Sequence, residues 1–408
     1  MSDFELIVVG GGLASARALR SYREAGGEGR ALLVSEDAAV PYHRPPLSKR
    51  FLRGEIEREG TLVEPESFYA EHDVELALET SARGIDPGAC RLELSGGRQV
   101  SYRRLLLATG ASPRRLDAPG GDLGGVFYLR TLADSERIRA ATTHGERAVV
   151  VGAGFIGMEV AASLRRLGLE VSLVHQGQSL FAAFGSPAIS AYLAELYRRE
   201  GVELVLGDGV AEFRGEEGRL QSVRTTEGRE LVADLAVIGI GVVPSTGFLE
   251  GSGLDVEDGI VVNDRFETGA PSIYAVGDVA RFDDPVLGKQ RRIEHWSNAN
   301  YQGTEVGKAL AGAQIYYDNV SSFFSEVFGL SLKSFGDSTE FDGQVSRGSL
   351  PDAFVDFLLL GDRLVGTALT GLDEDAENEL KALIRRRAEV SDREKLADPS
   401  IPLAEAFS

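Results

Sequence analysis

Two glycine-rich turns stand about one domain apart in the chain, and each follows an apolar run and opens a helix-like stretch. The first spans residues 10–15 and reads Gly-Gly-Gly-Leu-Ala-Ser, and the second spans residues 152–157 and reads Gly-Ala-Gly-Phe-Ile-Gly. Glycines at these spacings allow a tight turn and let the backbone approach a pyrophosphate at a helix N-terminus. One such turn is a weak signal, but two in this context predict that the chain binds two dinucleotides and passes electrons between them.

In the first turn, Gly10 permits the bend and Gly12 lets the backbone come close to a phosphate, while Ser15 replaces the third glycine with a small residue. Glu36 lies at the end of the next strand-like run, where a carboxylate can accept hydrogen bonds from ribose hydroxyls. The alternative for Glu36 is a solvated strand end. Because the glycine turn precedes it in the expected order, we predict the ribose role.

The second turn has all three glycines, but the strand-like run after it ends in a different way. That run, residues 170–175, ends in His175 and is followed by Gln176, so the carboxylate that favours an unphosphorylated ribose is missing. No arginine stands nearby in the sequence to bind a 2′-phosphate. NADH and NADPH therefore both remain open at this site, and a plain surface residue is an equally good interpretation of His175.

Strand-like and helix-like runs alternate around both turns, which predicts an α/β fold with two Rossmann-like dinucleotide-binding domains. The predicted strands span residues 6–9, 30–35, 90–94, 98–108, 147–151, 170–175, 235–240 and 273–276, and the predicted helices span about 13–25 and 155–167. Ser297 is a candidate N-cap for a further helix that runs to about Leu310. The last part has no nucleotide turn and is predicted to be an α+β domain, with strands at 326–335, 354–360 and 363–370 and a helix at 373–388.

Composition and charge limit the classes of protein to consider. At 408 residues the chain is long enough for two or three domains, and its formal charge of −20 disfavours nucleic acid as a partner. No apolar stretch approaches the ~20 residues that span a bilayer, and the acidic start is unlike a secretory signal. The five histidines show no ligand spacing, so no metal is expected. The single cysteine, Cys90, allows no internal disulfide and fits a reducing cytoplasm.

Further segments narrow this interpretation. The chain reads Arg-Pro-Pro-Leu-Ser-Lys at 44–49, Ala-Thr-Gly at 108–110, Leu-Arg-Thr-Leu at 129–132, Gly-Asp-Val at 277–279 and Glu-His-Trp-Ser-Asn-Ala at 294–299. Together with the two turns, these segments resemble the FAD-dependent pyridine nucleotide oxidoreductases, in particular the ferredoxin and rubredoxin reductase branch that supplies oxygenases and cytochromes P450. Apoptosis-inducing factor is a more distant relative. The resemblance covers nearly the whole chain.

The resemblance implies roles for individual residues. FAD would be bound by Gly10, Gly12, Leu13, Ala14, Ser15, Glu36, Arg44, Lys49, Ala82, Arg130, Asp278 and Trp296. NAD(P)H would be bound by Gly152, Gly154, Phe155, Ile156, Gly157, Glu159, His175 and Gly239. The catalytic residues would be Lys49 and Glu159, paired beside the flavin, and Trp296 at the flavin ring. A helix N-terminus near Trp296 would stabilise negative charge on the reduced flavin.

The resemblance also implies a reaction and a partner. NAD(P)H would give a hydride to FAD, and the electrons would leave one at a time to a protein carrier, either a [2Fe–2S] ferredoxin or a rubredoxin. NADH is the expected donor, with NADPH possible, and the protein would be a monomer or a homodimer. Two alternatives stay open, namely a redox-responsive NADH-binding flavoprotein of the apoptosis-inducing-factor type and a reductase of quinones or other small acceptors.

Three domains follow from the same resemblance. A discontinuous FAD-binding domain would comprise residues 1–111 and 240–318, an NAD(P)-binding domain residues 112–239, and a C-terminal α+β domain residues 319–408. One segment departs from the family pattern, because the usual Phe-Trp-Ser-Asp reads Phe-Phe-Ser-Glu at 323–326, which leaves the carrier's identity open. Disulfide reductases and cysteine-dependent peroxidases need a cysteine beside the flavin and are not expected, since Cys90 lies on a strand-like run outside any motif.

Arg291 and Arg292 lie just before the Glu-His-Trp segment, with Ile293 between. Ferredoxins are commonly acidic, so an acidic reductase needs a local basic patch to dock them. We therefore predict that these two arginines form the docking patch, with solvated surface charges as the alternative.

Overall fold

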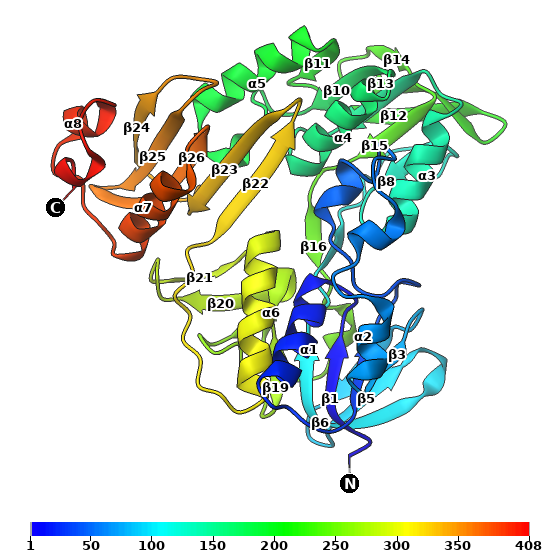
Figure 1. The fold of residues 1–408 in the computed structure, drawn as a ribbon. Coiled ribbons are helices and arrows are strands. Elements are labelled where there is room, and N and C mark those ends of the chain that lie inside the picture. The colour runs from blue at the N-terminus through cyan, green and yellow to red at the C-terminus, as the bar shows by residue number, and fades with distance from the viewer. Residues whose placement is uncertain (1, 408) are drawn as a thin grey trace. The chain divides into compact units, whose positions relative to one another are not determined.

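The computed structural model describes residues 2–407, which form two compact units (Figure 1). The first unit contains the chain up to Arg44 together with Arg58–Ser112 and Val243–Ser321. The second unit contains Pro45–Glu57, Pro113–Val242 and the chain from Ser322 onward. Each glycine turn therefore lies in its own unit.

A largely parallel sheet of order β3-β2-β1-β6-β5-β4, with β19 also paired to β6, forms the centre of the first unit. Its strands are β1 (Phe4–Val9), β2 (Ala31–Val34), β3 (Val74–Ala77), β4 (Ala82–Asp86), β5 (Arg91–Leu94), β6 (Gln99–Leu107) and β19 (Ile273–Ala275). The central strand β1 pairs in parallel with β2 and β6 and is buried along nearly its whole length. Its apolar sequence, Phe-Glu-Leu-Ile-Val-Val, is what a strand covered on both faces requires.

Helices α1 (Leu13–Glu24) and α6 (Trp296–Leu310) lie side by side in the first unit (Figure 1). A Cβ added at Gly303 would lie 2.5 Å from the carbonyl oxygen of Ala14, so the two backbones approach closely only because this residue is glycine. The same unit contains α2 (Glu66–Glu71) and a small sheet of β17 (Val256–Glu257), β18 (Gly259–Val262), β20 (Ala280–Asp284) and β21 (Lys289–Arg292).

The second unit contains a parallel sheet of order β11-β10-β9-β15-β8. Its strands are β8 (Val126–Tyr128), β9 (Arg147–Val151), β10 (Glu170–His175), β11 (Val202–Leu206) and β15 (Leu235–Ile238), and its helices are α3 (Leu132–Thr142), α4 (Phe155–Arg166) and α5 (Pro187–Arg199). An antiparallel sheet of β12 (Val210–Glu216), β13 (Arg219–Thr225) and β14 (Glu230–Val232) also belongs to this unit.

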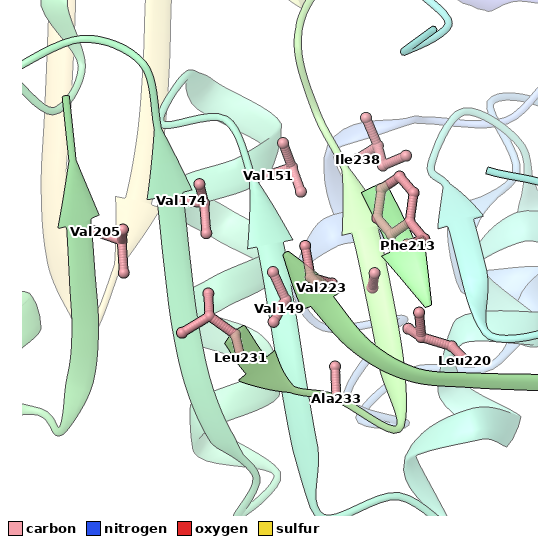
Figure 2. Packing of buried hydrophobic residues seen from close by; sticks show 11 residues of the cluster. Val149, Val151, Val174, Val205, Phe213, Leu220, Val223, Leu231, Ala233 and Ile238 are labelled. Carbon is pink, nitrogen blue, oxygen red and sulfur yellow. The ribbon is translucent and has the colours of Figure 1, made fainter. Parts of the chain in front are cut away.

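Buried side chains from these two sheets pack into one apolar cluster (Figure 2). The parallel sheet contributes Val149, Val151, Val174 and Val205, and the antiparallel sheet contributes Phe213, Leu220, Val223 and Leu231. The cluster fixes β9 and β10, whose carboxyl ends carry the second glycine turn and His175.

The second unit also contains an antiparallel sheet of order β22-β23-β26-β25-β24 with two helices. These elements are β22 (Ser322–Val327), β23 (Leu330–Gly336), β24 (Gly343–Gly348), β25 (Phe354–Leu360), β26 (Arg363–Thr370), α7 (Glu374–Arg385) and α8 (Arg393–Ala397). This arrangement confirms the predicted α+β character of the last part. The short strands β7 (Ala111–Pro113) and β16 (Val242–Pro244) lie where the chain passes from one unit to the other.

Two predicted elements differ from the structure. The single strand expected at 326–335 is a hairpin of β22 and β23, because Phe328 and Gly329 adopt positive φ values of 51° and 88° that reverse the chain. The prediction that Ser297 caps a helix is wrong. Helix α6 begins at Trp296 after an extended His295, so Ser297 lies inside the first turn.

The two units group the chain differently from the three predicted domains. The segment Pro45–Glu57 belongs to the second unit, and so does the C-terminal sheet. The three-domain division therefore stays a prediction. Within residues 2–407, no helix combines the length and the apolarity needed to cross a bilayer.

Candidate nucleotide-binding and redox site

The first glycine turn has the shape that a phosphate requires. Gly10 has φ +122°, and a Cβ there would lie 2.1 Å from the carbonyl oxygen of Ala108, so no other residue fits. A Cβ at Gly12 would meet only the Arg44 guanidinium, whose Nη1 is 3.1 Å away. Gly12 is the N-cap of α1 and brings no side-chain hydrogen bond to the helix. The open helix start beside a cation fits a dinucleotide phosphate.

The helix caps distinguish the candidate ligand sites from ordinary helix starts. Helices α3, α5, α7 and α8 are capped by the side chains of Thr131, Ser186, Asp373 and Asp392. In contrast, α1, α4 and α6 have no side-chain cap bond, and the same is true of the short α2. The backbone N–H groups that begin α1 and α4 are therefore available to an anionic ligand.

Other residues predicted to bind FAD lie around this turn in the first unit. Glu36 lies two residues after the end of β2 and is exposed, as the ribose role requires. Ser15 is fully buried, and its Oγ has no hydrogen-bond partner among residues 2–407, which leaves a polar atom for a ligand. Leu13 and Ala14 are buried in the first turn of α1. Ala82 opens β4, and Asp278 lies in the short turn after β19, where both are half-buried.

Trp296 begins α6 and makes a contact that the sequence does not reveal. Its Nε1 donates a hydrogen bond to Nδ1 of His43 at 3.0 Å, and the two ring centroids are 5.7 Å apart. Burial, with a further contribution from Arg17, lowers the pKa of His43, which keeps the ring neutral and its Nδ1 able to accept. Burial also lowers the pKa of His295, the α6 N-cap, to about 4. The start of α6 is therefore polar and preorganised but has no titrating charge near neutral pH.

The second glycine turn is equally constrained by its neighbours. A Cβ at Gly152 would lie 2.3 Å from the carbonyl oxygen of Gly239, and a Cβ at Gly157 would lie 1.9 Å from that of Gly152. Gly154 differs, because a Cβ there would meet nothing within 4 Å. Gly152 and Gly157 thus fix the turn, whereas Gly154 leaves open space in front of the start of α4.

His175 ends β10 beside this turn, as predicted. The backbone N–H of Ala153 donates to its Nδ1 at 3.4 Å, and burial lowers the pKa of the ring. The imidazole is therefore neutral at pH 7 and supplies no permanent cation to a 2′-phosphate.

An aromatic group lies at the start of α4. Phe155 is half-buried, and its ring centroid is 3.6 Å from that of Phe323 and 4.8 Å from that of Phe181. Phe181 has a positive φ of 53°, and its backbone N–H donates to the carbonyl oxygen of Ala153 at 3.0 Å. The adjacent Ile156 is 41% exposed. Aromatic side chains thus border the second turn while its glycine face stays open.

The predicted ion pair of Lys49 and Glu159 is present in the second unit. Lys49 Nζ lies 2.5 Å from Glu159 Oε2, and the two side chains are only 12% and 5% exposed. Ser48 Oγ donates to the same oxygen at 2.5 Å, and Ser325 Oγ donates to Oε1 at 2.7 Å. The buried carboxylate has a counter-ion and two hydroxyl donors, which offset the cost of removing it from water.

The loop that carries Lys49 is fastened to two helices. Pro45–Ser48 forms a short 3-10 helix in which two prolines restrict φ. Ser135 on α3 donates to the carbonyl oxygen of Leu47 at 2.8 Å, and Ser163 on α4 donates to that of Ser48 at 2.7 Å. These bonds explain why the segment belongs to the second unit, and they hold the lysine in a fixed position.

The structure corrects the prediction for Arg291 and Arg292. Arg291 Nε lies 2.8 Å from Oδ2 of the buried Asp284, and Arg292 pairs with Asp258 at 3.0 Å and with Glu294. Both arginine side chains are only 12% exposed. The predicted docking patch is therefore wrong at these residues, because docking cations must be accessible and these are already engaged in ion pairs.

Arg130 lies in the second unit directly before Thr131, the N-cap of α3, and its backbone N–H donates to Asp134 Oδ2 at 3.0 Å. Its contact with FAD stays a prediction.

Sequence reasoning missed His43, Ser48 and Ser325. For His43 and Ser48 the available signal was their position inside the proline-rich loop, whereas nothing local marks Ser325.

Comparison with known proteins agrees with this geometry. Residues 4–303 match the family model described as pyridine nucleotide-disulphide oxidoreductase, and residues 322–407 match the model described as reductase C-terminal. The chain is 35% identical to putidaredoxin reductase of Pseudomonas putida over 99% of this chain and 96% of that protein. It is 36% identical to rhodocoxin reductase of Rhodococcus erythropolis over 88% of this chain and 85% of that protein.

Solved structures show the same relationship. The putidaredoxin reductase in its covalent complex with putidaredoxin superimposes with a TM-score of 0.93 at 34% identity, covering 100% of this chain and 98% of that one. The ferredoxin reductase for the CYP199A2 system of Rhodopseudomonas palustris has a TM-score of 0.92 at 33% identity, covering 99% and 100% of the two chains. The chain therefore belongs to the pyridine nucleotide-disulphide oxidoreductase family and has the α/β fold of its putidaredoxin reductase-type members.

Proposed function

We propose that this protein is an FAD-dependent reductase that takes electrons from NAD(P)H and passes them to a [2Fe–2S] ferredoxin or a rubredoxin. The relatives named as reductases of putidaredoxin and rhodocoxin support this reaction class. The observation that carries it is the Lys49–Glu159 ion pair, in which the buried Glu159 lies on α4 two residues beyond the second glycine turn. With one cysteine in the chain, no redox disulfide can take its place.

The residues of the first unit fit FAD. Gly10 makes the tight turn, Gly12 leaves room for a pyrophosphate beside Arg44, and Glu36 is placed for the ribose hydroxyls. FAD, when bound, supplies two-electron exchange with a nicotinamide and one-electron exchange with a carrier. At α6, the aligned backbone dipoles behind Trp296 favour negative charge near the helix start. Trp296 is held by His43, so its indole presents one fixed surface.

The residues of the second unit fit a nicotinamide nucleotide. The open space at Gly154 admits a pyrophosphate to the start of α4. Lys49 and Glu159 supply a fixed pair of opposite charges, which orients the hydride donor and excludes water without any proton transfer. No residue needs to act as an acid or a base in hydride exchange.

The first test of the proposal is the flavin itself. Purified protein should be yellow and should release about one FAD per chain on denaturation, because the first turn and Glu36 fit an adenine dinucleotide. Chromatography of the released chromophore distinguishes FAD from FMN. Folded protein that carries FMN alone, or no flavin after incubation with FAD, would overturn the assignment.

Nucleotide choice should favour NADH moderately. A 2′-phosphate adds negative charge, and the neutral His175 offers it no cation. Replacing His175 by glutamate should strengthen the preference for NADH by about tenfold or more, through hydrogen bonds to the ribose and repulsion of the phosphate. The ratio of kcat/KM for NADH and NADPH measures this preference, and His175→Gln is the uncharged control. A native preference for NADPH of about a hundredfold would contradict the proposal.

We also propose the domain division given by the resemblance, with FAD bound by residues 1–111 and 240–318, NAD(P)H by 112–239, and a C-terminal domain at 319–408. The two family models support the proposed start of the C-terminal domain, since one model ends at residue 303 and the other begins at residue 322. The proposed location is the cytoplasm, where a lone Cys90 would stay reduced.

A further inference from the structure

Strand β22 of the C-terminal sheet contacts helix α4 at two successive positions. Phe323 and Ser325 are two residues apart on β22 and therefore share one face of the strand. Phe155 and Glu159 are four residues apart on α4 and share one face of the helix. The ring centroids of Phe323 and Phe155 are 3.6 Å apart, and Ser325 Oγ donates to Glu159 Oε1 at 2.7 Å. The C-terminal sheet thus reaches the same helix face that carries the ion pair.

The two oxygens of the Glu159 carboxylate have different partners. Oε2 receives Ser48 Oγ and Lys49 Nζ, each at 2.5 Å. Among residues 2–407, Ser325 is the donor to Oε1. Glu159 is 4% exposed and Ser325 only 1%, so bulk water does not reach this bond. Removing the Ser325 hydroxyl would leave a buried carboxylate oxygen without its donor.

We propose that Ser325 is a positioning residue for hydride exchange, acting through Glu159. The terminal torsion of a glutamate is broad, so Lys49 alone does not fix the plane of the carboxylate. A donor on Oε1 fixes that plane and keeps Oε2 directed at Lys49 and Ser48. The proposal rests on the proposed function, in which the Lys49–Glu159 pair orients the hydride donor. It gives the C-terminal sheet a direct part in the nucleotide reaction.

The test compares side chains that differ only in the hydroxyl. Thr and Val have nearly the same shape, so Ser325→Thr should keep the wild-type rate, while Ser325→Val and Ser325→Ala should lower the maximal rate of NADH oxidation about tenfold with little change in KM. Ser334→Ala on β23 is the matched control, because Ser334 is also a buried serine of this sheet and lies opposite Phe323. It should leave the rate unchanged.

A double-mutant cycle shows whether the effect passes through Glu159. In a Glu159→Ala background, Ser325→Ala should cause no further slowing. The same cycle measured on thermal unfolding of the holoprotein should give a coupling between the two residues, a readout that does not depend on turnover. Flavin content of every holoprotein variant is measured by its absorbance.

The outcomes separate this proposal from the proposed function. If Glu159→Ala slows NADH oxidation but Ser325→Ala and Ser325→Val do not, the positioning role is wrong and the proposed function stands. If Ser325→Ala slows the reaction equally in the presence and absence of the Glu159 carboxylate, the positioning role is also wrong. If neither Glu159→Ala nor Ser325→Ala slows NADH oxidation, the Lys49–Glu159 pair does not orient the hydride donor.

Discussion

Replacing Glu159 by alanine should slow the bleaching of flavin absorbance by NADH at least about 100-fold, equivalent to roughly 2.7 kcal/mol of transition-state stabilisation. The substitution leaves Lys49, whose side chain is only 12% exposed, without its counter-ion. Leaving one member of a buried pair alone commonly costs about 3–5 kcal/mol. Lys49 should therefore move toward water, and the hydride donor loses its fixed orientation. Retention of FAD should change much less, because the first glycine turn lies in the other unit.

A glutamate–lysine ion pair elsewhere in the same unit, with a buried carboxylate and a partly exposed lysine, provides the control. Glu377 on α7 is 7% exposed and lies 2.5 Å from Lys333. Glu377→Ala should lower the melting temperature but leave the rate of flavin bleaching near the wild-type value. Stopped-flow absorbance at saturating NADH measures the rates. Equal rates for wild-type and Glu159→Ala protein would make Glu159 a purely structural residue.

Two of the three glycines of the second turn, Gly154 and Gly157, should respond to alanine in different ways. A Cβ at Gly157 would lie 1.9 Å from the carbonyl oxygen of Gly152, so Gly157→Ala forces α4 away from β9 and should destabilise the protein by several kcal/mol. Gly154 has a negative φ and open space, so Gly154→Ala should fold with an unchanged melting temperature. Its methyl group would occupy the approach of the pyrophosphate and should raise the Kd for NADH about tenfold or more.

Calorimetry of NAD⁺ binding and thermal melting of the holoprotein test this pair together. Normal affinity of Gly154→Ala protein for the nucleotide would show that the pyrophosphate does not bind at the start of α4. Gly157→Ala with normal stability would contradict the close packing of the turn.

The elements that position the nucleotides could be predicted because their signals are local. The apolar runs before Gly10 and Gly152 are continuous parallel strands, and the helices after them begin at the expected residues. The hairpin at Phe328 was missed because a phenylalanine with positive φ has no sequence signature. Ser297 was wrongly predicted to be the N-cap of α6. The N-cap is His295, which is extended and makes no side-chain hydrogen bond to the helix, so its sequence does not mark it as a cap.

The candidate site was predictable only in part. The pairing of Lys49 with Glu159 came from family resemblance, since the two residues lie far apart in the chain. Ser325 reaches the same carboxylate from a third segment, and only the packing of β22 on α4 shows this. Arg291 looked exposed in the sequence, yet it pairs with the buried Asp284 on the neighbouring strand β20. Tertiary partners of charged residues have no local signal.

Reduction of cytochrome c through a carrier is the most direct test of the central claim. Holoprotein is mixed with NADH and cytochrome c, with or without a [2Fe–2S] ferredoxin or a rubredoxin, and a quinone replaces the carrier in a parallel reaction. The account predicts that NADH bleaches the flavin quickly and that cytochrome c reduction depends on the protein carrier. Rapid bleaching followed by a long-lived reduced complex that neither carrier reoxidises, or turnover supported by the quinone alone, would contradict it.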